Sequence, residues 1–328
     1  MYKLDVKDQK ILAELDIDAR QSNSEIGKKV GLSKEVVKYR IDRLVENKII
    51  LRFHTVVNYF RLGIVKHKLY LRLTNANKEK MEEIARYFFN HKKTEWVALS
   101  TGRWDLICGF LVGNINEFDD EVQAVMNKFS EHIQEKAVTS TLYLAHSTRK
   151  FLRKSSGELA DVVYHTAKDR QEKIDETDAE ILKTITNNAR MPATEIAKRL
   201  KTTPRIIQYR LKEMEKKKII LAYRAHLEPK NMGRIFCKAI FYLSNTTEEK
   251  LRSFMGYSSS LHGTVWPQRV MGSWDFELDT ELETYDQFQD MILNLKEKFP
   301  EIIRGHDFCI VSKEFKLDLF PGAYRELN

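Results

Sequence analysis

Residues 22–50 are SNSEIGKKVGLSKEVVKYRIDRLVENKII, and residues 192–220 are PATEIAKRLKTTPRIIQYRLKEMEKKKII. The two stretches align without a gap at an offset of 170 residues. The same offset relates DVKDQKIL, which starts at Asp5, to DETDAEIL, which starts at Asp175, and it continues far beyond both stretches. Self-similarity at one fixed offset indicates an internal repeat. The 328-residue chain is therefore expected to be a tandem duplication in which two diverged copies keep their register.

Three short helices are expected at the start of each copy. In the first copy, apolar residues at helical spacing predict an amphipathic helix over residues 5–16. Ser22 and Glu25 have the spacing of a capping box, which opens a second helix. Gly31 is suited to end that helix, because glycine adopts the left-handed conformation without strain. Ser33 is expected to cap the third helix.

An extended segment follows the third helix. Residues 49–60, IILRFHTVVNYF, are rich in β-branched and aromatic residues and predict a β-wing. Three helices followed by a wing are typical of a winged helix-turn-helix, whose third helix can enter the major groove of DNA. Residues 175–230 keep this pattern, although Lys201 stands in the place of Gly31.

The outward face of each third helix carries candidate DNA contacts. Lysine and arginine can neutralise phosphates, and hydroxyl and amide groups can hydrogen-bond to bases or phosphates. The predicted contacts are Ser33, Lys34, Lys38, Tyr39 and Arg40 in the first copy, and Thr203, Arg205, Gln208, Tyr209 and Arg210 in the second. Glutamine can bind adenine through two hydrogen bonds, whereas lysine favours guanine or phosphate. The alternative is that these are solvated surface helices of small helical domains.

A second module follows each wing. In the first copy the pattern predicts two helices and four strands in the order βαββαβ: a strand over 64–73, a helix over 77–91, strands over 94–101 and 104–112, a helix over 116–131, and a strand over 136–145. This order is typical of an antiparallel sheet with helices on one face, the ferredoxin-like arrangement, so the fold class is α+β. That fold hosts many functions and indicates none by itself.

Five segments are expected along the chain. They are a winged helix-turn-helix over 1–60, a ferredoxin-like domain over 61–147, a partly helical linker over 148–173, a second winged helix-turn-helix over 174–230, and a second ferredoxin-like domain over 231–328. Within the linker we expect a helix over 158–172. Its basic cluster, Arg149, Lys150, Arg153 and Lys154, is expected to be a solvated connector surface, with contact to phosphate as the alternative.

Composition restricts the class of protein. The net charge of +8 is consistent with a polyanionic partner, although composition does not identify one. The 3 cysteines form no CxxC pair, so neither a disulfide framework nor a thiolate metal site is expected. The sequence contains no run of 18 or more apolar residues, so no membrane span is expected. We expect a cytoplasmic protein without a cofactor or a metal.

The order of these motifs resembles the Lrp/AsnC (feast/famine) family of transcriptional regulators. The resemblance is carried by LDVKDQKILAEL at 4–15, SEIGKKVGLS at 24–33, VVKYRIDRLVENKII at 36–50 and GRWD at 102–105, and it covers nearly the whole chain twice. The family usually has one copy per chain and dimerises through its ferredoxin-like effector domain, called the RAM domain. Two copies fused in one chain are a departure from that pattern.

The resemblance also implies an amino acid or a related small effector, bound where effector domains meet. The corresponding residues here are Thr101, Gly102, Asp105, Gly272 and Asp275. A glycine lets backbone amides approach a carboxylate closely, and an aspartate can pair with an ammonium group. The alternative is structural: the glycines permit the hairpins, and the aspartates satisfy neighbouring backbone groups.

The sequence thus predicts a DNA-binding transcriptional regulator that acts as a single-chain pseudo-dimer, with further homo-oligomers left open. One alternative is a DNA-architectural protein without an effector. Another is an enzyme, because siroheme decarboxylases resemble the same two-module architecture. Those enzymes carry a histidine- and arginine-bearing segment in the central hairpin of the second module, whereas residues 94–106 and 264–276 here contain no histidine. We therefore predict no catalytic residues and no enzymatic activity.

Overall fold

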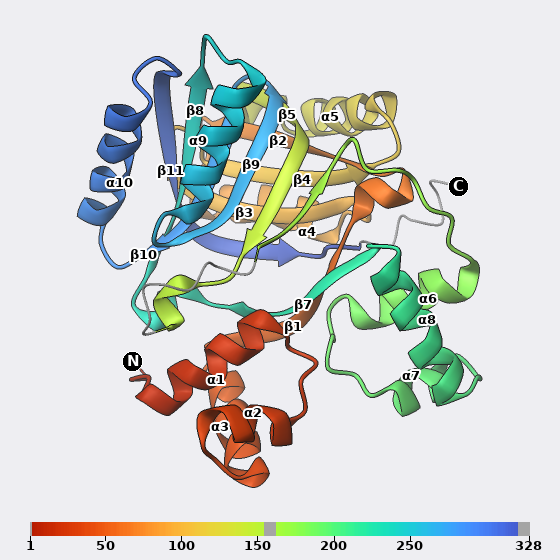
Figure 1. Ribbon diagram of the computed structural model, residues 1–328. Coiled ribbons are helices and arrows are strands. Elements are labelled where there is room, and N and C mark those ends of the chain that lie inside the picture. Colours follow the sequence, from red (N-terminus) through yellow and green to blue (C-terminus); the bar gives the residue numbers. More distant parts are fainter. Residues whose placement is uncertain (1, 154–161, 321–328) are drawn as a thin grey trace. The chain divides into compact units, whose positions relative to one another are not determined.

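A computed structural model describes residues 2–153 and 162–320 (Figure 1). The chain divides into two compact units that do not coincide with the two sequence copies. The first unit comprises residues 1–58, 146–163 and 172–234, and the second comprises residues 59–145, 164–171 and 235–328. Each unit therefore combines one module from each copy.

The first unit contains the two winged helix-turn-helix modules. Their elements are α1 (Val6–Ile17), α2 (Asn23–Val30), α3 (Lys34–Glu46) and β1 (Ile50–Val57) in the first copy, and α6 (Glu176–Ile185), α7 (Ala193–Arg199), α8 (Pro204–Lys216) and β7 (Ile220–Leu227) in the second. The predicted capping box of Ser22 and Glu25 is present, and Gly31 ends α2 with φ +68°. Lys201, which replaces that glycine in the second copy, adopts the same left-handed backbone with φ +52°.

Strands β1 and β7 pair antiparallel and join the two modules into one ribbon. His54 lies opposite Arg224 in this pairing, and the two positions are equivalent in the repeat. The ribbon therefore runs across a pseudo-two-fold axis between the copies. Each wing strand forms backbone hydrogen bonds with the edge of the other, so this pairing removes an open strand edge from both modules.

The second unit contains the two ferredoxin-like modules. Their elements are β2 (Val65–Leu73), α4 (Lys78–Asn90), β3 (Thr94–Gly102), β4 (Leu106–Val112), α5 (Ile115–Phe129) and β5 (Ile133–Ser147) in the first copy, and β8 (Ile235–Leu243), α9 (Glu248–Ser260), β9 (Thr264–Gly272), β10 (Phe276–Leu282), α10 (Tyr285–Lys298) and β11 (Ile303–Leu317) in the second. Both copies have the predicted βαββαβ order, which confirms the α+β fold class.

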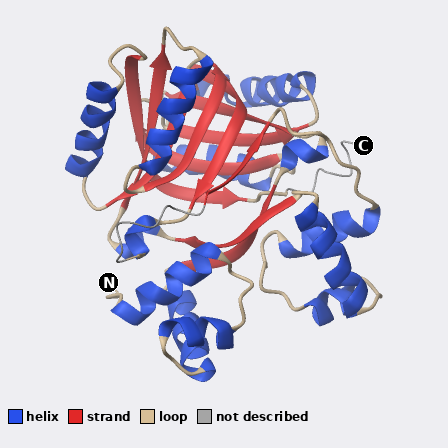
Figure 2. Ribbon diagram, in the orientation of Figure 1, coloured by secondary structure: helices blue, strands red, loops and turns tan. Residues whose placement is uncertain are grey.

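The strands of both modules, together with β6 (Val162–Thr166) of the linker, form one sheet in the order β2-β4-β3-β11-β8-β10-β9-β5-β6. An additional pairing of β2 with β5 closes the sheet on itself and leaves β6 outside the ring. The last strand of each copy begins beside its own module and ends beside the other: β5 pairs with β2 and then β9, and β11 pairs with β8 and then β3. Figure 2 shows these strands in red and the helices in blue.

Two structural differences from the sequence expectations lie in the linker. Within its described part, residues 162–166 form strand β6, so the helix expected over 158–172 is wrong there; residues 158–161 lie outside the described residues. Arg149 is buried and pairs with Asp16 at 2.7 Å, so the solvated connector was also wrong at this residue. Leu152 packs in the apolar core of the first module, and it anchors the start of the linker.

Charged side chains are buried inside the closed sheet. The Lys68 Nζ lies 2.5 Å from the Glu277 carboxylate, and the Lys238 Nζ lies 3.1 Å from the same group. Lys238 also pairs with Asp279 at 2.6 Å, and the Trp274 Nε1–H donates to Glu277. Burial opposes ionisation of Glu277, but the two ammonium groups outweigh it and hold its pKa well below the usual value. The carboxylate is therefore charged and fully paired.

Removing that carboxylate's charge should destabilise the protein strongly. We expect Glu277→Gln to lower the free energy of unfolding by about 3–5 kcal/mol, because Lys68 and Lys238 stay buried without their shared counter-charge. Urea denaturation followed by tryptophan fluorescence measures the change. Glu301→Gln is the control, since Glu301 pairs with Lys250 on the surface and is 69% exposed; it should have little effect. Equal losses in the two variants would contradict the structural assignment.

A buried histidine should make the protein sensitive to acid. His67 stacks on Phe118 with 4.7 Å between ring centroids, and its Nδ1 lies 2.7 Å from the Ser140 Oγ. Burial lowers the pKa of His67 to about 4. The ordinary pKa of histidine is 6.5. Below pH 6.5 this residue binds a proton in the unfolded chain but not in the folded chain, so the free energy of unfolding falls as the pH falls from 6.5 toward 4. This histidine contributes about 3 kcal/mol to that loss.

His67→Phe should keep the ring stacking and remove this contribution. Unfolding free energies at pH 7 and pH 4.5 should therefore differ less in the variant than in the wild type. Parallel pH dependences in the two proteins would exclude His67 as a source of the acid sensitivity.

Candidate nucleic-acid interface

The recognition helix of each module is held against the first helix by an arginine. Arg40 Nη1 lies 2.7 Å from carboxylate oxygens of both Asp5 and Asp8, and Arg40 is only partly exposed. Asp5 and Asp8 also form the capping box of α1, so one pair of carboxylates fixes both helices. Burial raises the pKa of Asp5, but the backbone N–H of Asp8 and then the hydrogen bond and charge of Arg40 outweigh it, so this pKa lies below its usual value.

The second copy repeats this arrangement. Arg210 Nη1 lies 2.7 Å from Asp175 and 2.8 Å from Asp178. The structure thus gives Arg40 and Arg210 a positioning role. Their guanidinium groups face the first helices, and a DNA contact by either arginine remains a prediction.

The other predicted contacts lie together on the exposed side of each recognition helix. They are Ser33, Lys34, Lys38 and Tyr39 on or beside α3, and Thr203, Arg205, Gln208 and Tyr209 on or beside α8. Ser33 and Thr203 act as helix caps, and each hydroxyl oxygen accepts a backbone N–H of the first turn at 3.3 Å. The Lys38 Nζ pairs with Asp42 at 2.6 Å, one turn further along α3.

Sequence reasoning missed two exposed apolar residues in the first turns of these helices. Val36 is 39% exposed and Ile206 is 44% exposed, and they occupy equivalent positions in the two copies. The inward positions of α3 are Val37, Ile41 and Leu44. That spacing already places residue 36 outside the core, so the period of the helix was the signal that could have identified both residues.

A reciprocal pair of arginines ties the two modules together. Arg20 Nη1 donates to the carbonyl oxygen of Ala189 at 2.6 Å, and Arg190 Nη1 donates to that of Ala19 at the same distance. Arg20 and Arg190 are equivalent in the repeat. In the sequence, the equivalence of these two arginines indicated only that the chain is duplicated. Together with the β1–β7 ribbon, the clasp makes one body that carries both recognition helices.

The predicted effector glycines lie where strands of the two copies meet. Gly102 (φ +116°) is opposite Cys309 of β11, and Gly272 (φ +140°) is opposite Thr139 of β5. A Cβ atom on Gly102 would clash with the carbonyl oxygen of Phe308. Both positions therefore need glycine for close strand approach as well as for their backbone conformation.

The predicted effector aspartates hold backbone groups. Asp105 Oδ2 accepts the N–H of Leu73 at 2.7 Å, and Asp275 Oδ2 accepts the N–H of Leu243 at 2.7 Å. The structural role anticipated for these carboxylates is thus present. Thr101 is exposed beside the first hairpin, and an effector bound at these five residues remains a prediction.

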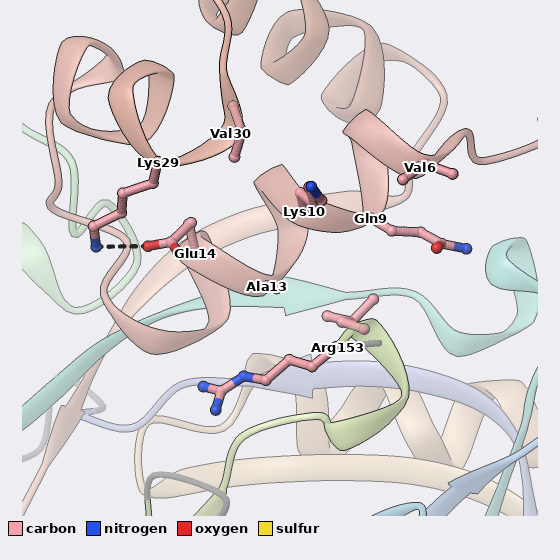
Figure 3. A pocket seen from close by; sticks show the side chains of 9 residues that line it. Val6, Gln9, Lys10, Ala13, Glu14, Lys29, Val30 and Arg153 are labelled. Carbon is pink, nitrogen blue, oxygen red and sulfur yellow. Dashed lines mark hydrogen bonds and ion pairs between the residues drawn. The ribbon is translucent and has the colours of Figure 1, made fainter. Parts of the chain in front are cut away.

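A pocket of about 230 Å³ lies along α1 of the first module (Figure 3). Its lining mixes apolar and charged residues: Val6, Gln9, Lys10, Ala13, Glu14, Lys29, Val30, Leu152 and Arg153. The Lys29 Nζ pairs with Glu14 at 2.7 Å within it. No residue of this pocket belongs to the predicted DNA or effector sets.

The described part of the chain contains neither a candidate metal site nor a candidate membrane-spanning helix. Among residues 2–153 and 162–320, no three histidine, cysteine, aspartate or glutamate side chains are grouped so that they could hold a metal ion. No helix among these residues is long and apolar enough to cross a membrane.

Comparison with known proteins identifies the helical modules. Residues 4–45 match the AsnC-type helix-turn-helix domain, and residues 174–220 match a winged helix-turn-helix DNA-binding domain. The HTH-type transcriptional regulator Rv2324 of Mycobacterium tuberculosis is 31% identical over 125 residues, which cover 38% of this chain and 84% of the relative. The proline dehydrogenase transcriptional activator of Rhizobium radiobacter is 28% identical over 149 residues, which cover 45% of this chain and 92% of the relative.

The fold of the whole chain has a solved counterpart. The siroheme decarboxylase NirDL matches 98% of this chain and 98% of its own length with a TM-score of 0.62, at 14% sequence identity. At that identity the likeness concerns the fold alone. The regulators supply the sequence relationship, and the chain belongs to the Lrp/AsnC family of helix-turn-helix transcriptional regulators.

Proposed function

We propose that this protein is a sequence-specific DNA-binding transcriptional regulator that works as a single-chain pseudo-dimer. The observation that carries the proposal is the first unit, in which the exposed faces of α3 and α8 belong to one body. Two recognition helices in one compact unit can contact two half-sites at a set spacing. The regulators among its relatives support the same function.

The two recognition helices present different chemistry to DNA. Gln208 stands where the first copy has Lys38, and Arg205 stands where it has Glu35. An amide can bind adenine through two hydrogen bonds, whereas lysine favours guanine or phosphate. A homodimer repeats one half-site by symmetry, so this protein should instead recognise an asymmetric operator or a degenerate palindrome.

The buried charges support pairing between unlike modules. Glu277 and Asp279 are equivalent to Ile107 and Gly109 of the first copy, so only the second copy supplies these acids. The first copy supplies Lys68, which Glu277 neutralises. Two second-copy modules would bring four such acids together, and this like-charge juxtaposition is costly in a buried interface. The charge pattern thus favours the intramolecular pseudo-dimer.

We further propose a cytoplasmic location and regulation by an amino acid at the hairpin residues named above. The regulator family supports both, and further assembly of pseudo-dimers stays compatible with this scheme. Thermal unfolding with a panel of amino acids tests the effector. If no amino acid shifts the melting temperature and random DNA binds as tightly as selected DNA, a DNA-architectural protein replaces the regulator.

Enzymatic activity is the competing function, because NirDL has the same fold over the whole chain. We propose that this protein is not an enzyme. The central hairpins, residues 94–112 and 264–282, contain no histidine that could serve as a general acid or base. Mixing the protein with siroheme tests the alternative: a shift of the siroheme absorbance would favour the enzyme.

Replacement of one recognition helix by the other should change the selected DNA sequence. Full-length protein is used for in vitro selection from random DNA, and the experiment is repeated after residues 33–43 are replaced by the sequence of residues 203–213. We expect the asymmetric motif to become a palindrome of the second half-site, because both modules then present glutamine in place of Lys38. An unchanged motif would contradict recognition by these helices.

The arginine clasp should be needed for binding two half-sites together. Arg20→Met/Arg190→Met keeps a long apolar side chain at each position but removes the clasp, together with the guanidinium groups that lie over the Tyr223 and Phe53 rings. We expect the affinity for the full operator to fall by about 10-fold or more, because loosened modules give a lower effective concentration of the second recognition helix at its half-site. The affinity for one isolated half-site should stay unchanged. Electrophoretic mobility shifts measure both.

Arg252→Met is the control for the clasp, since Arg252 is an exposed arginine on α9 in the other unit. It should leave both affinities unchanged. An equal loss on full and half operators in the double variant would show that the clasp arginines act within each module or on DNA directly.

A further inference from the structure

Each recognition helix exposes an apolar patch in its first two turns. Val36 and Ile206 are exposed at equivalent positions, and one turn later Tyr39 and Tyr209 are 60% and 65% exposed. The cores of the two modules are complete without them. The inward residues are Val37, Ile41 and Leu44 in α3, and Ile207, Leu211 and Met214 in α8. These apolar side chains therefore face solvent in the free protein.

The helix caps hold Val36 and Ile206 in place. The backbone N–H of Val36 donates to Ser33, and that of Ile206 donates to Thr203. Both residues are therefore the third residue of their helix, in the turn that points toward base edges when a recognition helix enters the major groove. Both are β-branched, so their methyl groups are held by a restricted χ1 and lose little freedom on contact.

The chemistry of the major groove limits what such a side chain can contact. Base edges there offer hydrogen-bond donors and acceptors, which an aliphatic group cannot satisfy, and the C5-methyl group of thymine, which it can cover. We propose that Val36 and Ile206 each contact the methyl group of a thymine, one in each half-site. This inference rests on the proposed DNA-binding function and specifies how its sequence recognition works.

The neighbours of these residues show what the two half-sites share and where they differ. Residues at the flanking positions change in charge and type between the copies, with Glu35 against Arg205 and Lys38 against Gln208. The aliphatic residue at 36 and 206 and the tyrosine at 39 and 209 are kept. A thymine at the same place in both half-sites is thus expected beside bases that differ.

Replacement of thymine by deoxyuridine tests the contact, because it removes only the methyl group. The full-length protein is titrated with the duplex obtained by in vitro selection, in which each thymine is replaced in turn. At one position in each half-site we expect the affinity to fall about 3- to 5-fold, the effect of losing one buried methyl group. In Val36→Ala the loss should disappear at the first half-site only, and in Ile206→Ala at the second only.

Val45→Ala provides the matched control, since Val45 is 41% exposed on the last turns of the same helix. It should keep both deoxyuridine effects. Alanine at these exposed helical positions favours the helix, and circular dichroism checks that each variant is folded.

The outcomes separate this inference from the function on which it rests. Specific binding that no deoxyuridine weakens would overturn the methyl contacts and leave the regulator intact. A deoxyuridine effect that persists in Val36→Ala and Ile206→Ala would overturn the assignment to these residues. If no selected DNA binds at all, the proposed function fails, and the methyl contacts fail with it.

Discussion

Strand pairing between the two sequence copies is the interaction on which the rest of this structure depends. In the first unit β1 pairs with β7, and in the second β5 and β11 each leave their own module to pair with the other. Every module would otherwise present an open strand edge, which invites association with other chains. Gly102 and Gly272 make the second set of pairings possible, because a side chain there would meet the neighbouring backbone.

The buried charges favour particular partners in this pairing. The closed sheet encloses Lys68 and Lys238 together with Glu277 and Asp279, and these two acids come from the second copy, whereas the buried Glu95 of the first copy pairs with Lys66 of that same copy. Buried ion pairs are a weak source of stability compared with apolar packing of the same volume, but an unmatched buried charge is costly. The arrangement therefore matters chiefly for which module meets which, and it fits a chain whose two DNA-binding modules have diverged.

The local structure of the four modules was predictable from the sequence, whereas the strand in the linker and the pairing between copies were not. Capping boxes, helical periodicity and the repeat indicated the helices and the βαββαβ order, since those signals lie within a few residues of each other. Which strand edge receives β5 depends on residues far away in the chain. Charge alone also misled in the linker: Arg149 looks like a surface residue in the sequence, yet it is buried and pairs with Asp16. Arg40 pairs with Asp5 and Asp8, and its DNA contact stays a prediction.

The pairing of both copies within one chain has a consequence for dosage in the cell. A regulator that must dimerise falls apart on dilution, so its operator occupancy rises with the square of its number when molecules are scarce. In the proposed pseudo-dimer, two modules tied by β1 and β7 have no such threshold. Operator occupancy by the proposed pseudo-dimer would then rise in direct proportion to the number of chains, and a few newly synthesised molecules would be enough to begin a graded response.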